Sequence, residues 1–346
     1  MKKVAVMTGG GDCPGLNAII RAVVRSGLRH GFETFGIHNG WQGLIEGELE
    51  PLSDISVSGI TSLGGTVLGT SRIDPLKKPG DVEKIEKTIR TYRIDALVVI
   101  GGNGTLSAAH ELSVRGIPLV GVPKTIDNDI SGTDLAVGFD TAVSIVTEAI
   151  DRLHTTAESH HRIMVVETMG RDSGWIALMA GIAGGADVIL IPEIRFTVDE
   201  VCRDLRDRVT KGKKFSIVVV AEGTHHEDIA DEKVPECNRD ECGHEKFVGV
   251  GNLLGKELEH RLGIETRVTV LGHVQRGGTP TAFDRVLATR FGVSAVEQIA
   301  ADNLGCLVVL NGTRIGTVPL REVASRIKPI PPEIYHCATT IMKGTW

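Results

Sequence analysis

A glycine-rich turn at residues 9–11 follows the short apolar run Val4–Thr8 and precedes a segment of helical period at residues 16–29. Backbone amides of such a turn, together with the positive end of the next helix, bind oxyanions without a lysine. The spacing matches neither the dinucleotide pattern G-x-G-x-x-G nor the P-loop pattern. The turn therefore predicts a phosphate site, with an ordinary tight turn as the alternative.

Two carboxylates follow a second apolar run, at residues 119–122. Asp127 and Asp129 are two residues apart, so their side chains project to the same side if the backbone there is extended. One could accept a proton from a hydroxyl while the other holds Mg²⁺ on a polyphosphate. Taken alone, an Asp-Asn-Asp triplet is more typical of a turn that caps its own backbone, so this interpretation depends on the motifs around it.

Arginines beside glycine turns or strand ends supply positive charge in an acidic protein. The chain has 38 Lys and Arg against 44 Asp and Glu, a net charge of −6, which argues against a protein that binds nucleic acid over its whole surface. Arginine matches phosphate with two parallel hydrogen bonds. The arginines therefore indicate a polyanionic substrate, such as a sugar phosphate with a polyphosphate donor; they are Arg72, Arg162, Arg171, Arg267 and Arg276.

The elements that position these residues alternate between short β-rich runs and helix-period segments, which indicates an α/β fold with parallel sheets. Ligands bind at the carboxyl ends of such strands, where the glycine turns fall. We expect strands with both faces buried at residues 4–8, 34–37, 96–100, 119–122, 163–167, 188–191, 215–221, 268–271 and 307–310. We expect helices at residues 16–29, 82–92, 142–153, 198–209 and 283–300.

Length and composition are those of a globular protein. The 346 residues suffice for about two domains of roughly 100 to 200 residues each. The six cysteines are scattered and no secretory leader precedes them, so we expect a reducing cytoplasm. Apolar runs all fall short of the roughly 18 residues of a membrane helix, so no membrane association is expected.

The motifs, taken in order, resemble those of the bacterial-type 6-phosphofructokinase family, and the likeness covers nearly the whole chain. It rests on Gly-Gly-Asp-Cys-Pro-Gly-Leu-Asn at 10–17, Gly-Gly-Thr at 64–66, Pro-Lys-Thr-Ile-Asp-Asn-Asp at 123–129, Met-Gly-Arg at 169–171 and Leu-Gly-His-Val-Gln-Arg-Gly-Gly at 271–278. Together these motifs are far more specific than any single glycine turn.

The resemblance implies two similar Rossmann-like α/β/α sandwich domains with mainly parallel sheets and an active site in the cleft between them. The larger domain, residues 1–137 plus about 277–324, would bind the phosphoryl donor. The smaller domain, residues 138–276 plus about 325–346, would bind fructose 6-phosphate.

The implied reaction is the Mg²⁺-dependent, glycolytic transfer of a phosphoryl group from ATP to the 1-hydroxyl of fructose 6-phosphate. Asp127 would be the base, and Thr125, Arg72 and Arg171 would assist as catalytic residues. The implied donor contacts are Gly11, Arg72, Ile73, Gly102, Asn103, Gly104, Thr105 and Lys124, and the implied metal positions are Asn103 and Asp129. The implied sugar-phosphate contacts are Thr125, Asp127, Arg162, Met169, Gly170, Arg171, Glu222, Arg267, His273 and Arg276. Arg162 and Arg267 match arginines that the family delivers across a subunit boundary, which implies a homotetramer or homodimer with shared active sites.

Three positions near the implied donor site affect the choice of donor and metal. Asn103 stands where the family usually has an aspartate that helps to position Mg²⁺, so metal affinity or turnover would fall. Gly104 leaves room for the α-phosphate of ATP and favours ATP. Lys124 is the residue of pyrophosphate-dependent members, so pyrophosphate is the alternative donor, although a long-chain branch of ATP enzymes combines the same glycine and lysine.

The family's effector pocket is only half present. Arg21, Arg25, Asp187 and Lys213 stand at effector positions, but two other basic positions have become Asp54 and His154. An acid there would oppose a phosphate, so we expect control by ADP or phosphoenolpyruvate to be weakened or altered.

Two alternatives of another kind stay open. With Asn103, the chain could be a catalytically weak regulatory paralogue that binds phosphosugars or nucleotides, although Asp127, Asp129 and Arg171 argue for an active enzyme. A likeness to NAD kinases at the turn around Asn103 does not extend to the rest of the chain.

The polar segment 223–251 is interpreted as a surface excursion rather than a zinc site, despite His225, His226, Cys237, Cys242 and His244.

Overall fold

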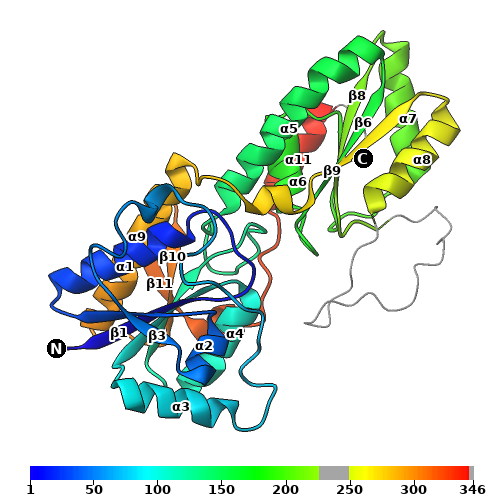
Figure 1. The fold of residues 1–346 in the computed structure, drawn as a ribbon. Helices are drawn as coiled ribbons and strands as arrows, with labels where there is room; N and C mark the ends of the chain where they lie inside the picture. Colours follow the sequence, from blue (N-terminus) through cyan, green and yellow to red (C-terminus); the bar gives the residue numbers. More distant parts are fainter. Residues whose placement is uncertain (226–248, 343–346) are drawn as a thin grey trace. The chain divides into compact units, whose positions relative to one another are not determined.

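A computed structural model describes residues 1–225 and 249–342. The chain forms two compact units (Figure 1). Unit 1 comprises Met1–Thr141 and Arg276–Lys328, and unit 2 comprises Ala142–Gln275 and Pro329–Trp346. Each unit is therefore built from two separate stretches of the chain.

Unit 1 contains a seven-stranded sheet in the order β11-β10-β5-β4-β1-β2-β3. Its inner strands run parallel, whereas β3 and β11 pair antiparallel at the two edges. The strands are β1 (Lys3–Thr8), β2 (Glu33–Ile37), β3 (Leu49–Leu52), β4 (Ala96–Gly101), β5 (Leu119–Pro123), β10 (Cys306–Asn311) and β11 (Arg314–Pro319). Because β1, β4 and β5 are parallel neighbours, the segments that follow them meet at one edge of the sheet.

Helices cover both faces of this sheet (Figure 1). On one face α1 (Leu16–Arg29) packs against α9 (Ala282–Ala300). The two helices approach closely because Gly292 lacks a side chain, since a Cβ there would lie 2.6 Å from the Cβ of Ala22. The other face carries α2 (Trp41–Glu46), α3 (Asp81–Tyr92), α4 (Asn103–Val114) and α10 (Leu320–Val323).

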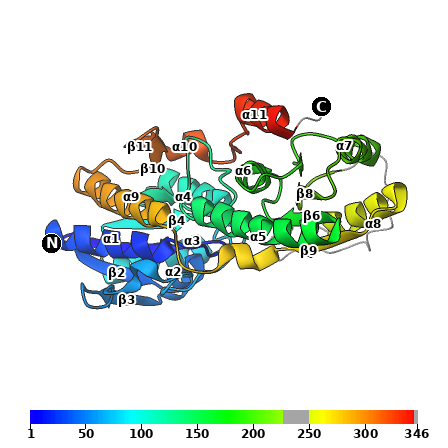
Figure 2. The same ribbon diagram turned by 90° about the horizontal axis from the view of Figure 1, so that it is seen from above.

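Unit 2 contains a parallel four-stranded sheet in the order β7-β8-β6-β9. Its strands are β6 (Ile163–Thr168), β7 (Val188–Leu190), β8 (Ser216–Ala221) and β9 (Thr266–Val270). Its helices are α5 (Phe139–His160), which begins in unit 1, α6 (Trp175–Ala183), α7 (Val198–Thr210), α8 (Val250–Leu262) and α11 (Pro332–Met342). Figure 2 shows α7 and α8 beside these strands, where they bury a shared apolar core.

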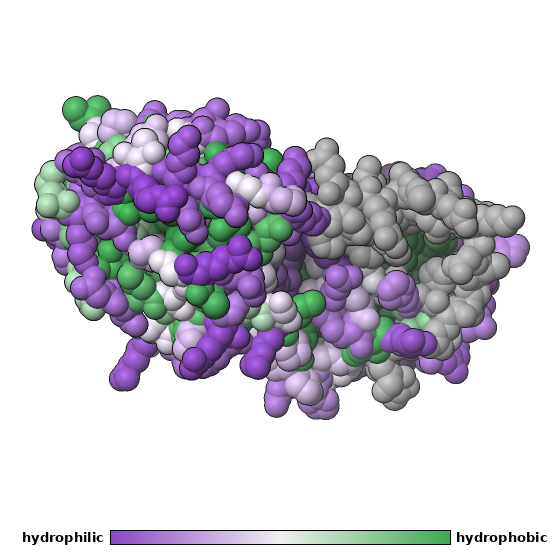
Figure 3. All heavy atoms as spheres, turned by 90° about the horizontal axis from the view of Figure 1, so that it is seen from below, coloured by the Kyte–Doolittle hydropathy of each residue, from purple (hydrophilic) through white to green (hydrophobic). Residues whose placement is uncertain are grey.

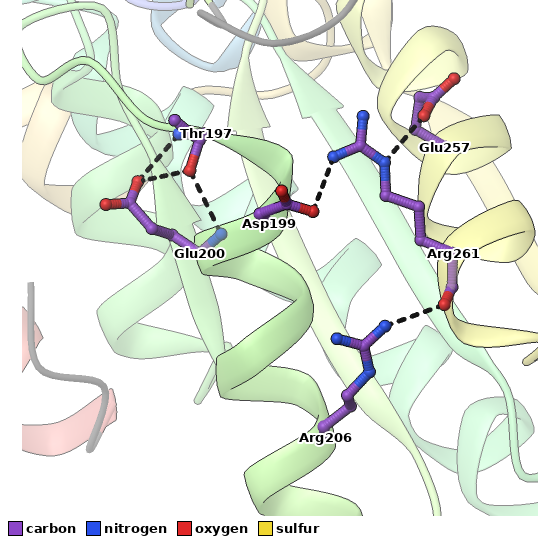
Figure 4. Close-up of polar contacts among 6 residues, drawn as sticks. All are labelled: Thr197, Asp199, Glu200, Arg206, Glu257 and Arg261. Carbon is purple, nitrogen blue, oxygen red and sulfur yellow. Dashed lines mark hydrogen bonds and ion pairs between the residues drawn. The ribbon is translucent and has the colours of Figure 1, made fainter.

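Polar contacts fix the start of α7 and join α7 to α8 (Figure 4). Thr197 and Glu200 form a capping box at the first turn of α7, a device whose loss typically costs about 1 kcal/mol. Arg261 of α8 pairs with Asp199 at 2.9 Å and with Glu257 at 3.0 Å. Arg206 of α7 donates to the carbonyl oxygen of Arg261 at 2.9 Å.

The predicted α/β class with mainly parallel sheets is confirmed, and each predicted strand coincides with an observed one to within two residues. The prediction that every strand is buried on both faces is wrong for β9, an edge strand with partly exposed residues. The antiparallel edges β3 and β11 and several helices were not predicted. Among these is α4, so Asn103 and Gly104 lie in the first turn of a helix rather than in a loop.

In the view of Figure 3, hydrophilic residues cover most of the described surface and hydrophobic residues form small areas between them. Within the described residues, none of the helices is both long and apolar enough to cross a membrane.

Candidate functional site

The glycine turn after β1 is packed against three other segments of unit 1. The amide of Gly9 donates to Ile100 O at 2.9 Å and the amide of Gly10 donates to Ser71 O at 3.0 Å. Gly10 has a φ of 79°, which a residue with a side chain rarely adopts. The amides of Gly9 and Gly10 thus serve the fold, and the amide of Gly11 is left as the predicted phosphate donor.

The same contacts place other predicted donor residues around the turn. Thr105 is buried beneath it, since a Cβ on Gly9 would lie 2.7 Å from its methyl group. The bond to Ser71 brings the neighbouring Arg72 and Ile73 to the turn; Arg72 is exposed and Ile73 is 37% exposed. Gly102 is the N-cap residue of α4. A Cβ at Gly104 would meet no atom within 4 Å, so the space beside it is open.

Lys124 lies under the glycine turn. Its side chain is 3% exposed, and its Nζ donates to Gly9 O at 3.0 Å and to Gly11 O at 2.5 Å. Burial lowers the pKa of Lys124, whereas the charges of Asp127 and Asp12 oppose that shift. The ammonium group is therefore engaged with the backbone carbonyls that shape the turn.

The predicted base lies in a segment held by β5 and the residues after it. Thr125 Oγ1 accepts from the amide of Asp127 at 3.1 Å and lies 3.3 Å from Asp127 Oδ2. Asn128 has a φ of 52°, so the segment is not extended as the same-side expectation required. Even so, Thr125, Asp127 and Asp129 are each partly exposed between buried neighbours, which leaves all three side chains access to a ligand.

Asn103 and Asp129, the two predicted metal positions, are in direct contact. Asn103 Nδ2 donates to Asp129 Oδ2 at 2.7 Å. One carboxylate and one amide oxygen suit a Mg²⁺ ion that takes its other ligands from phosphates and water. Among the described residues, His, Cys, Asp and Glu nowhere gather in threes that could hold a metal. The carboxylate and amide oxygens of Asp129 and Asn103 are thus compatible with the predicted metal position.

In unit 2, another group of predicted residues gathers at the carboxyl ends of β8, β6 and β9. The amide of Arg171, which follows β6, donates to Glu222 Oε1 at 3.1 Å just after β8. The intervening turn at 169–170 is shaped by Gly170, with a φ of 146°, and by the amide of Met169, which donates to Gln275 Oε1 at 3.3 Å. His273, exposed, follows β9. This edge offers an arginine and a carboxylate side by side.

Arg162 and Arg267 lie at the opposite end of the same strands, because Arg162 precedes β6 and Arg267 pairs with Met164 near the start of β9. Arg162 Nε is 2.5 Å from Glu265 Oε2, and Arg267 forms an ion pair with the same carboxylate. At about 3.3 Å per residue, the length of β6 separates them from Arg171 by some 20 Å. Within one chain, the structure does not bring these two groups together.

Arg276 belongs to unit 1. Its guanidinium group lies against Gly11, where a Cβ would overlap it, and its buried Nε has no hydrogen-bond partner among the residues that the structure describes. The residue expected to bind the sugar phosphate thus contacts the glycine turn, and its charge adds to that of Lys124.

Two of the predicted effector residues, Arg25 and Asp187, are engaged in ion pairs. Arg25 Nε lies 2.6 Å from Asp54 Oδ1. Asp187 Oδ1 lies 2.7 Å from Arg208, and Asp187 Oδ2 accepts from the amide of Ile217 at 2.9 Å. Arg21 lies on α1 of unit 1, whereas Asp187 and Lys213 belong to unit 2. Burial raises the pKa of Asp187, and the Ile217 hydrogen bond and Arg208 oppose that rise.

Some contacts that shape the site were not predicted. Lys124 was predicted to contact the donor and to influence which donor is used, and its bonds to the glycine carbonyls carry no sequence signal. Lys328 was missed altogether, although its amide donates to Asp129 O at 2.8 Å. The proposed zinc alternative involved His226, Cys237, Cys242 and His244, which lie outside the described residues.

Comparison with known proteins gives a consistent result. Residues 3–299 match the family described as phosphofructokinase. The chain is 53% identical over 336 residues to the pyrophosphate–fructose 6-phosphate 1-phosphotransferase of Amycolatopsis mediterranei, which covers 96% of this chain and 98% of the relative. It is 50% identical over 344 residues to the ATP-dependent 6-phosphofructokinase of Mycobacterium leprae, which covers 97% of this chain and 98% of that relative.

Among solved structures, the phosphofructokinase of Saccharomyces cerevisiae superimposes with a TM-score of 0.81 at 36% identity, over 99% of this chain and 47% of the yeast chain. The chain thus spans about half the length of that yeast protein. The family match and the identities over nearly the full chain, together with the glycine turn and aspartates described above, show that the chain belongs to the phosphofructokinase family.

Proposed function

We propose that this protein transfers a phosphoryl group from ATP to the 1-hydroxyl of fructose 6-phosphate, giving fructose 1,6-bisphosphate and ADP. The observation that carries the proposal is the position of Asp127 and Thr125 directly after Lys124, whose ammonium group is bonded to the glycine turn. The proposed proton acceptor and the proposed phosphate-binding turn are thereby connected within unit 1.

In this reaction the O1 oxygen attacks the terminal phosphorus of the donor, the bond to the leaving diphosphate breaks, and Asp127 accepts the hydroxyl proton. Thr125 holds the backbone of Asp127, and the Gly11 amide with Arg72 neutralises charge on the transferring group. A Mg²⁺ ion held by Asp129 and Asn103 would supply further neutralisation of phosphate charge. Arg171 and Glu222 of unit 2 bind the sugar phosphate.

ATP is the proposed donor because the space beside Gly104 is open. Pyrophosphate is the second candidate, supported by Lys124 and by the relatives at 53% identity that are named for it. Initial rates with fructose 6-phosphate and Mg²⁺, measured separately with ATP and with pyrophosphate at matched concentrations, test the proposal. Product with pyrophosphate alone would contradict the assignment of ATP, and product with neither would favour a regulatory paralogue.

Arg162 and Arg267 are proposed to serve the active site of a neighbouring subunit, in a homotetramer or homodimer. Their distance from Arg171 along β6 supports this assignment. Co-expression of an Asp127→Ser chain with an Arg162→Ala chain tests it, because some mixed interfaces would contain one intact site. Activity in the mixture well above that of either parent is expected, and no recovery would contradict the shared site.

A further inference from the structure

A segment distant in sequence lies along the loop that carries the predicted base and metal ligand. This loop, residues 127–134, is called the Asp127–Asp134 loop below. Ile130 forms an isolated antiparallel bridge with Ile327, and the amide of Lys328 donates to Asp129 O at 2.8 Å. The side chain of Ile130 is only 1% exposed, so the bridge forms at a residue that fixes the loop by its burial.

The side chain of Lys328 extends the same contact to the far end of the loop. Its Nζ donates to Thr133 O at 3.1 Å and to Asp134 O at 2.8 Å. Together with its amide, Lys328 therefore makes three hydrogen bonds to backbone oxygens of the Asp127–Asp134 loop. A charged donor makes stronger hydrogen bonds than a neutral one, so the ammonium group is well suited to hold carbonyls that have no strand partner.

The loop needs such support because its backbone is irregular. Asn128 is left-handed with a φ of 52°, and such a residue persists only where its surroundings determine it. Its buried side chain accepts from the amide of Ala136 at 3.0 Å. Beyond it, the amide of Asp134 donates to Leu310 O at 2.9 Å. The carboxyl end of β10 and Lys328 thus both hold the backbone of the loop through hydrogen bonds.

We propose that Lys328 is a positioning residue for phosphoryl transfer, which acts by holding the Asp127–Asp134 loop so that Asp127 and Asp129 keep their places. The inference rests on the proposed function. The hydrogen bonds of Lys328 run to the backbone of the loop that carries these two carboxylates. Its loss should therefore affect the reaction step more than the binding of fructose 6-phosphate, whose proposed contacts Arg171 and Glu222 belong to unit 2.

The test compares three variants of the full-length protein. Lys328→Met keeps the length of the side chain and removes the two hydrogen bonds from Nζ to Thr133 O and Asp134 O, while the backbone amide can still donate to Asp129 O. Lys2→Met is the matched control, because Lys2 Nζ also donates to a backbone carbonyl of unit 1, that of Ile299 at 3.1 Å. Lys328→Arg retains a charged donor and tests for rescue.

We expect Lys328→Met to lower kcat by roughly 10- to 100-fold, as for a misplacement of a catalytic group by up to 1 Å, while the KM for fructose 6-phosphate changes less than about 3-fold. Lys328→Arg should recover part of kcat, and Lys2→Met should behave as the wild type. An unchanged kcat in Lys328→Met, or an equal loss in Lys2→Met, would overturn the inference.

Hydrogen–deuterium exchange provides a readout that does not require activity. Amides of residues 126–136 should exchange faster in Lys328→Met than in the wild type, with little change elsewhere in unit 1. If the wild type transfers phosphate from neither donor, the proposed function fails, yet faster exchange confined to these amides would still support the positioning contact. Unchanged exchange there would overturn it.

Discussion

Substitution of Lys124 separates two roles that this lysine could have. If its ammonium group acts through the carbonyls of Gly9 and Gly11, a Lys124→Met variant should lose activity with both donors. If the ammonium group instead contacts pyrophosphate, the variant should lose activity with pyrophosphate but keep its activity with ATP. The two carbonyl bonds at 3.0 and 2.5 Å favour the first role.

The size of the effect follows from the contacts. Two hydrogen bonds from a charged donor contribute about 1.5–3 kcal/mol each, but the methionine also removes the cost of burying an ammonium group, which is of the order of several kcal/mol. These two contributions largely cancel, so the net change of folding free energy should lie within about 3 kcal/mol of zero. Release of the glycine turn by about 1 Å would lower kcat/KM by on the order of 100-fold for either donor.

The assay is kcat/KM for ATP and for pyrophosphate in the wild type, in Lys124→Met and in Lys84→Met, the last as a control on an exposed lysine paired with Asp81. The ratio of the two values should stay within about 3-fold of the wild-type ratio. If the wild type uses one donor only, Lys124→Met should use the same one. A change in the ratio beyond about 10-fold, which corresponds to 1.4 kcal/mol, would refute the positioning role.

Three further predictions concern the aspartates and the effector residues. Asp127→Ser should lower kcat by orders of magnitude with a modest change in the KM for fructose 6-phosphate, and near-normal turnover would contradict its role as base. Asn103→Asp should lower the Mg²⁺ concentration at half-maximal rate by roughly 10-fold. In EDTA the same variant should have a lower melting temperature than the wild type, because the new carboxylate and that of Asp129 would repel each other. Neither ADP nor phosphoenolpyruvate should shift the fructose 6-phosphate saturation curve of the wild type. The Asp54→Arg variant, in which Arg25 loses its ion pair with Asp54, should show a saturation curve that shifts when either effector is added.

The parallel core of the fold could be predicted because its strands are short apolar runs with helix-period segments between them. The edge strands were missed because their sequences lack that signal: β3 contains Pro51, and β11 contains Gly316 and is largely exposed. α6 was missed because it is apolar on all sides and shows no helical period. Burial on both faces was wrongly extended to β9, because the predicted range began at Val268 and left out Arg267, the charged residue typical of an edge strand.

The glycine turn and the aspartate segment could be predicted from residue type and strand position. The contacts that shape them could not. The bonds of Lys124 depend on where one long side chain points, and the bridge at Ile130 joins residues far apart in the chain. The left-handed backbone of Asn128 agrees with the tolerance of asparagine for that conformation and with the turn that was the alternative interpretation of this triplet, but residue type alone does not fix it. Residue types thus indicated the chemistry, whereas long-range packing determines the geometry.

The strand order of unit 1 also determines when its sheet can be completed during synthesis. β10 and β11 belong to this sheet but follow all the strands of unit 2 in the chain. Unit 2 therefore has its full set of strands once the ribosome has passed Val270, whereas unit 1 waits for Cys306–Pro319. Although domains generally fold from the N-terminus onward during translation, the sheet that begins first in this chain is the last to be completed.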